Sequence, residues 1–89
     1  MAGLDAIKAK IRDIAGRRRN VTSDEIQWVV NQLGQFYKVS SRPARHGALF
    51  TVGNQRFMIN SHNPGSKQVK PYSVDDFINA MIELGLCEE

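Results

Sequence analysis

The fold of this chain is decided by the stretch ALFTVGNQRFMI, residues 48–59. Apolar and aromatic residues favoured in strands stand on both sides of Gly53-Asn54, a pair typical of two-residue hairpin turns. The pattern predicts two antiparallel strands joined by a tight turn. Residues 35–40 have the composition of a third short strand, and residues 42–44, which contain a proline, are expected to interrupt it.

Two helices are expected on either side of these strands. Residues 22–25 form a capping box, in which the Thr22 hydroxyl accepts from the Glu25 amide and the Glu25 side chain reaches back. Apolar residues at helical spacing follow and predict a helix over residues 23–34. A last helix is expected to begin at Ser73, which can cap Asp76, and to end near Gly85.

An additional helix is expected at the N-terminus. Leu4, Ile7, Ile11 and Ile14 recur at three- and four-residue spacing, which predicts an amphipathic helix over residues 3–16. A basic connector follows it. Because the second helix carries its own cap, we expect residues 1–21 to be accessory and residues 22–89 to fold without them.

The predicted order of elements indicates the fold class. A short strand meander must bury one sheet face, and the helices over 23–34 and 73–85 are available to cover it. We therefore expect an α+β fold with the α-β-β-β-α layout of double-stranded-RNA-binding domains. It has a three-stranded antiparallel sheet and the extra N-terminal helix.

Length and composition limit the class of protein. The chain has 89 residues, enough for one small domain. Its single cysteine, Cys87, can form neither an intrachain disulfide nor a zinc site. No apolar run is long enough to span a bilayer, and the first residues lack the pattern of a secretory signal. A reduced, cytoplasmic protein without a membrane partner is expected.

Charge is strongly segregated along the chain. Residues 1–25 carry six basic and four acidic residues, and residues 75–89 carry five acidic residues and no basic one. The segment between them, residues 26–74, has no acid. Its basic residues are Lys38, Arg42, Arg45, Arg56, Lys67 and Lys70. Such a segment suits phosphates, and it lacks the carboxylates of glycosidase or magnesium chemistry.

These residues also carry a family resemblance. Residues 22–86 resemble the HicA-type toxins of bacterial toxin–antitoxin pairs, which are small ribonucleases with a fold like that of double-stranded-RNA-binding domains. The features that match are the capped helix ending at Gly34, the strand at 36–39, Arg45-His46-Gly47 before a strand ending at Phe50, the hairpin, His62, and residues 67–71 before the last helix.

Two features depart from the family pattern. The family usually places an aromatic residue three positions after its histidine, whereas Phe50 comes four positions after His46. Strict alternation would also put His46 on the same sheet face as Phe50, and a bulge at Gly47 would resolve this conflict. Residues 1–21 have no counterpart in the family.

The resemblance implies that His46 is the catalytic residue. Cleavage of RNA without a metal needs a base that takes the 2′-hydroxyl proton, and imidazole, with a pKa near ~6.5, suits this exchange. Charge on the phosphate would be neutralised by Lys38, Arg42 and Arg45.

The remaining expected contacts lie in the loop before the last helix and in the second helix. His62 is a possible general acid or substrate contact. Lys67 and Lys70 are expected to contact the RNA backbone. Trp28 is off the main apolar stripe of its helix, and we expect it to pack in the core rather than to stack on a base.

The resemblance then implies a toxin that cleaves mRNA as an endoribonuclease, without metal or cofactor. Its expected partners are mRNA and a cognate HicB-like antitoxin protein. The alternative is a non-catalytic RNA-binding module of the same fold, in which the basic residues hold the RNA backbone by shape.

Overall fold

The computed structural model describes residues 3–45, 47–61 and 67–88. In chain order they form α1 (Leu4–Arg17), α2 (Ser23–Leu33), β1 (Val39–Ala44), β2 (Gly47–Val52), β3 (Gln55–Asn60) and α3 (Pro71–Glu83). The expected α+β class and the α-β-β-β-α order after α1 are confirmed. No helix in the described part of the chain is long and apolar enough to cross a membrane.

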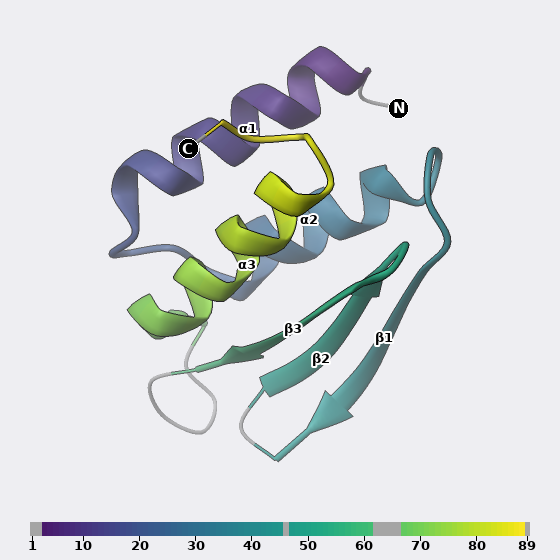
Figure 1. Ribbon diagram of the computed structural model, residues 1–89. Coiled ribbons are helices and arrows are strands. Elements are labelled where there is room, and N and C mark those ends of the chain that lie inside the picture. The colour runs from purple at the N-terminus through teal and green to yellow at the C-terminus, as the bar shows by residue number, and fades with distance from the viewer. Residues whose placement is uncertain (1–2, 46, 62–66, 89) are drawn as a thin grey trace.

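The elements form three layers, as Figure 1 shows. The strands make one antiparallel sheet in the order β1-β2-β3. Helices α2 and α3 cover one face of this sheet, and α1 packs against both of them on the side away from the strands. The opposite face of the sheet is left open.

The central hairpin is confirmed at its predicted position. Strands β2 and β3 pair from Gly47↔Asn60 to Val52↔Gln55, which leaves Gly53 and Asn54 as a two-residue turn. Gly53 has a φ of +60°, a conformation that glycine adopts without steric cost. The local turn signal therefore set the register of both strands.

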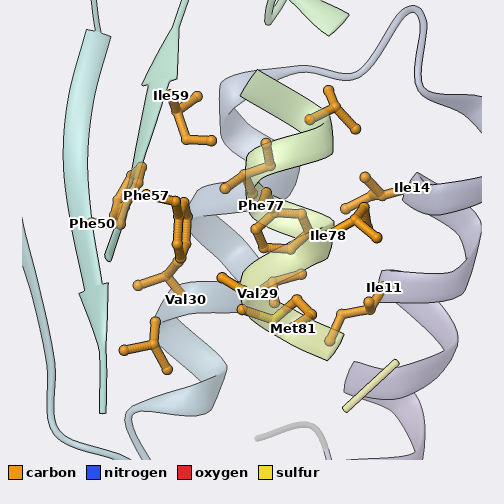
Figure 2. Close-up of a cluster of buried hydrophobic side chains, with 14 of the residues drawn as sticks. Ile11, Ile14, Val29, Val30, Phe50, Phe57, Ile59, Phe77, Ile78 and Met81 are labelled. Carbon is orange, nitrogen blue, oxygen red and sulfur yellow. The ribbon is translucent and has the colours of Figure 1, made fainter. Parts of the chain in front are cut away.

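Aromatic rings connect the sheet to the helices. The ring centroids of Phe50 and Phe57 are 5.7 Å apart, and those of Phe57 and Phe77 are 5.4 Å apart. Figure 2 shows Phe77 of α3 between the sheet and the isoleucines of α1. One continuous cluster of buried side chains therefore reaches from the sheet to the outer helix.

Helix α1 contributes directly to this cluster. Ile7, Ile11 and Ile14 are 0% exposed and belong to the same core as the sheet residues, whereas Leu4 is 36% exposed. The helix runs one residue past the expected end at Gly16, and Arg18 follows it with a φ of 40°. The division of the chain at residue 21 stays a prediction, but this packing makes removal of α1 costly.

The prediction for the first strand was wrong in position. Residues 35–38 continue the turn that ends α2, where the amides of Phe36 and Tyr37 both donate to the Leu33 carbonyl. Strand β1 begins only at Val39 and runs through Pro43, which was expected to interrupt it. Because β1 is at the sheet edge, the missing N–H of proline can face the unpaired side.

The predicted start of the last helix was also wrong. Helix α3 begins at Pro71, a residue well suited to the first turn, and its N-cap residue is Lys70. Ser73 does not cap the helix. It is buried, and its Oγ accepts a hydrogen bond of 2.9 Å from the Asn60 amide, which fastens α3 to the end of β3.

Gly47 is a regular member of the sheet rather than a bulge. It pairs with Ala44 of β1 and Asn60 of β3, without an extra residue on either side. A Cβ atom at this position would overlap the Ile59 carbonyl oxygen, which belongs to the backbone and cannot turn away. The close approach of β3 therefore requires glycine here.

Gly47→Ala is accordingly expected to destabilise the protein by about 1–3 kcal/mol, the usual cost of forcing atoms into a filled site. Gly16→Ala is the matched control, because nothing lies within 4 Å of a Cβ atom there and alanine favours a helix. Urea denaturation measures both changes. An equal stability for the two variants would contradict the close approach at Gly47.

Glu25 joins α1 to the start of α2. The expected capping box is present, with the Thr22 side chain accepting from the Glu25 amide and the Glu25 carboxylate accepting from the Thr22 amide at 2.9 Å. The same carboxylate pairs with Lys10 at 2.9 Å and with Arg17. Burial raises the pKa of Glu25, but hydrogen bonds from Arg17, Thr22 and Lys10 outweigh it and lower the pKa to about 2.

The lowered pKa predicts a pH-dependent contribution of Glu25 to stability. Because the folded pKa of about 2 lies below the ordinary value of 4.5, the contribution is complete above about 4.5 and is lost as the pH falls towards 2. Glu25→Gln is expected to cost ~0.5–2 kcal/mol at pH 7, the usual value of a helix cap, and clearly less at pH 2, where about half of the folded molecules have a protonated Glu25. Chemical denaturation at both pH values measures this. Exposed Glu83→Gln should have little effect at either pH, and a cost of Glu25→Gln that did not change with pH would refute the assignment.

Candidate nucleic-acid interface

The segregation of charge along the chain becomes a segregation in space. Every acidic residue in the described part of the chain lies on a helix or in the segment after α3, and the sheet carries none. The cations on or next to the sheet form no ion pair with any described residue. They are Lys38, Arg42, Arg45, Arg56 and Lys70.

Three of the basic residues on and just after α1 are in a different situation, whereas Lys8, Arg12 and Arg19 also form no ion pair with a described residue. Lys10 and Arg17 pair with Asp13 and Glu25, and Arg18 pairs with Asp75 at 2.8 Å. These pairs satisfy the cations within the protein and hold α1 in place. The cations of the sheet have no such local partner and are available to bind phosphates.

The open sheet face presents two arginines. Arg42 is opposite Leu49, which in turn is opposite Met58, so these three side chains form one row on the face opposite Phe50. Arg56 belongs to the next row, opposite Thr51. Both arginines are exposed. The open face therefore has a small apolar centre with a cation at each side.

A second group of side chains gathers where β3 meets α3. The Asn60 side-chain amide donates to the Tyr72 hydroxyl oxygen at 2.9 Å, and the Lys70 Nζ is 5.8 Å from the centre of the Tyr72 ring. Asn60 is paired with Gly47, which follows the turn that contains Arg45. The exposed ring of Tyr72 is thus held beside the β1–β2 turn, where it could stack on a base.

The structure brings together some of the predicted site residues. Arg42, Arg45 and Lys70 lie towards the end of the sheet formed by the β1–β2 turn. Lys38 lies at the other end, where its carbonyl accepts from the Gly53 amide at 2.9 Å. Six residues of strand separate the two ends, roughly 20 Å. Lys38 therefore cannot contact the same phosphate as Arg45.

Lys67 lies next to α2 rather than on the open face. Its carbonyl accepts from the Ser23 amide at 2.8 Å, and its Nζ is 3.6 Å from the Asp24 carboxylate. The two expected histidines, His46 and His62, lie outside the described residues. Their roles stay predictions.

A cavity of about 270 Å³ lies between the start of α2 and β2. Its described lining is Ser23, Asp24, Gln27, Gly47, Ala48, Phe50, Ile59 and Ser61. Ser41 and Pro43 of β1 share the sheet face of Phe50 by register but are exposed, because the helices pack mainly on the β3 side of the sheet.

Trp28 is an exposed aromatic side chain on α2. It is 38% exposed, so the prediction that it packs in the core was wrong. It lines a shallow cavity of about 360 Å³ with Lys10, Asp24 and Glu25.

Sequence reasoning missed Asn60, Tyr72, Asp24 and Gln27. Tyr72 could have been found as an aromatic residue beside Lys70 in the acid-free segment. The other three become neighbours of the site only through strand pairing or helix packing. Among the described residues, no three His, Cys, Asp or Glu side chains are grouped so as to hold a metal ion.

Comparison of the chain with protein-family models, with curated proteins and with solved structures found no match. The fold is consistent with that of a double-stranded-RNA-binding domain. A function must therefore be argued from the site itself.

Proposed function

We propose that this protein binds RNA along the open side of its sheet and cleaves it as a metal-independent endoribonuclease. One observation carries the proposal: the described sheet has no acidic residue, and the cations on and around it have no acidic partner among the described residues, whereas the cations of α1 are interspersed with Asp5 and Asp13. RNA phosphates complement such a surface.

His46 supplies the chemistry in this proposal. Its imidazole takes the proton of the ribose 2′-hydroxyl, and the oxygen attacks the adjacent phosphorus. The bond from phosphorus to the 5′-oxygen of the next nucleotide breaks, and that oxygen receives a proton, for which His62 is the candidate acid. The products are a 2′,3′-cyclic phosphate and a 5′-hydroxyl. Arg42 and Arg45 neutralise the charge that develops on the phosphate oxygens.

The same surface suits the partner expected for a HicA-like toxin. An acidic HicB-like antitoxin would cover the cations of the sheet and compete with mRNA for them. Co-expression of such a protein, encoded next to this chain, should relieve growth arrest caused by the toxin. Relief without formation of a complex would contradict this mode of inhibition.

A specific observation supports the alternative, a non-catalytic RNA-binding module. The family register would place its histidine three residues before Phe50, which here is Gly47. That position has no room for any side chain, because a Cβ atom would overlap the backbone of β3. Catalysis therefore depends on His46 acting from the preceding position.

Incubation with matched RNA and DNA strands in the presence of EDTA separates the two functions. The ribonuclease should cut the RNA, leave a cyclic phosphate end, and leave the DNA intact because DNA has no 2′-hydroxyl. RNA that is bound but not cut would favour the binding module. RNA that is neither bound nor cut would overturn both.

A further inference from the structure

The cavity between α2 and β2 is built from four parts of the chain. Ala48 and Phe50 of β2 and Ile59 of β3 give it an apolar wall. Polar side chains at its other side are Ser23, Asp24, Gln27 and Ser61. Its volume of about 270 Å³ is close to ~300 Å³, the lower end of the usual range for small-molecule pockets. A flat ring with a polar edge fits this combination of size and lining.

The polar side of the cavity is rich in hydrogen-bond acceptors. An ionised Asp24 carboxylate can only accept. The Gln27 side-chain amide donates one N–H at 3.0 Å to the Asn31 side-chain oxygen, which leaves its carbonyl oxygen and its second N–H available to a ligand. Serine hydroxyls can donate or accept. The cavity is therefore complementary to a ligand edge that carries hydrogen-bond donors.

Guanine is the RNA base with such an edge. Its N1–H and N2–H donors lie side by side and match the two oxygens of one carboxylate. Adenine and cytosine each place one amino donor beside an acceptor, and uracil has one donor between two acceptors. A carboxylate at the end of an apolar slot thus selects guanine among the four bases.

Lys67 completes a nucleotide site at the rim. Its Nζ is 3.6 Å from Asp24, and the two side chains are 76% and 74% exposed, so this ion pair is weak and easily replaced. When guanine is hydrogen-bonded to the Asp24 carboxylate, the Lys67 ammonium group can bind the phosphate of the same nucleotide. Gly47 also lines the cavity, so the bound base lies beside the β1–β2 turn.

We propose that this cavity holds one unpaired guanine base of the RNA and that Asp24 recognises its N1–H and N2–H donors. The inference rests on the proposed function and adds the base that the protein recognises.

The first test uses free nucleotides and does not depend on RNA cleavage. Millimolar guanosine monophosphate should shift the backbone amide NMR signals of Gln27 and Gly47. Inosine monophosphate, which lacks only the 2-amino group, should bind ~10–100-fold more weakly, as expected for loss of a hydrogen bond to a charged group. Equal shifts with both nucleotides, or no shift with the guanine nucleotide, would overturn the proposal.

The second test uses variants and short single-stranded RNAs that contain one guanosine or one inosine. Asp24→Asn should lose the preference for guanosine, whereas Asp76→Asn, at an exposed position of α3, should keep it. Thermal unfolding checks that both variants fold. If Asp24→Asn binds RNA with the wild-type preference for guanosine over inosine, the proposed base site is refuted, but the proposed RNA function is not. Selective binding of the guanine nucleotide without any RNA binding would instead refute the proposed function.

Discussion

Deletion of residues 1–20 is expected to abolish the cooperative unfolding of the remaining chain. Ile7, Ile11 and Ile14 are fully buried, and truncating one such side chain typically costs ~2–5 kcal/mol. Losing all three removes an amount comparable with the whole stability of a small domain, ~5–15 kcal/mol. The deletion also removes Lys10 and Arg17, the partners of Glu25 at the start of α2.

Thermal unfolding followed by circular dichroism, with amide NMR dispersion, measures this effect. The control is a chain that lacks residues 1–3, because Gly3 is exposed and nothing buried in the described structure is removed. A chain lacking residues 1–20 that melts within a few degrees of the full-length protein would show that residues 22–89 are an independent domain. Helix α1 would then be the accessory element that its sequence indicates.

His46→Ala is expected to lower the rate of RNA cleavage by ~10²–10⁴-fold, the usual contribution of one general acid–base group. RNA affinity should change little, because the cations that bind phosphate remain. The two effects are separated by single-turnover cleavage and by equilibrium binding to an uncleavable 2′-deoxy substrate. Circular dichroism confirms that the variant is folded.

His62→Ala is the comparison variant, and its effect should be smaller, since His62 is expected only as the acid for the leaving oxygen or as a substrate contact. Cleavage that survives in His46→Ala and disappears in His62→Ala would transfer the main catalytic role to His62. Loss of RNA affinity in His46→Ala, in parallel with cleavage, would show that the residue binds substrate rather than transfers a proton.

The elements that the sequence predicted are those with local signals. The capping box of α2 involves residues three apart, and the β2–β3 turn needs only Gly53-Asn54 between two apolar segments. Such patterns determine their elements within a few residues. They were correct in both type and position.

The errors arose where distant parts of the chain meet. Pro43 lies within a strand because that strand is at the sheet edge. Ser73 accepts a hydrogen bond from the Asn60 amide instead of capping α3, and Trp28, 38% exposed, lines a shallow cavity together with Lys10 of α1. In each case a partner far away in the sequence decides the environment, which no local pattern contains.

The residues of the candidate site also fall into those that a local pattern predicts and those that only tertiary packing brings together. Its cations were visible as a segment without acids, because charge can be read from the sequence. That Lys38 lies at the far end of the sheet depends on strand register. Asp24 was outside the acid-free segment, and only the packing of α2 against β2 brings it to the cavity beside Gly47.

The most direct test of RNA binding by the sheet compares two double variants with the same change in net charge. Arg42→Ala/Arg56→Ala removes two cations of the open face, and Lys8→Ala/Arg12→Ala removes two from α1, beside the C-terminal segment. RNA affinity is measured between about 50 and 200 mM salt, where each lost phosphate contact should lower the salt slope by about one. We expect the sheet variant to bind RNA much more weakly with a reduced salt slope and the α1 variant to bind nearly as the wild type does. Equal losses in the two variants, or a wild-type affinity that does not change with salt, would contradict binding by the sheet.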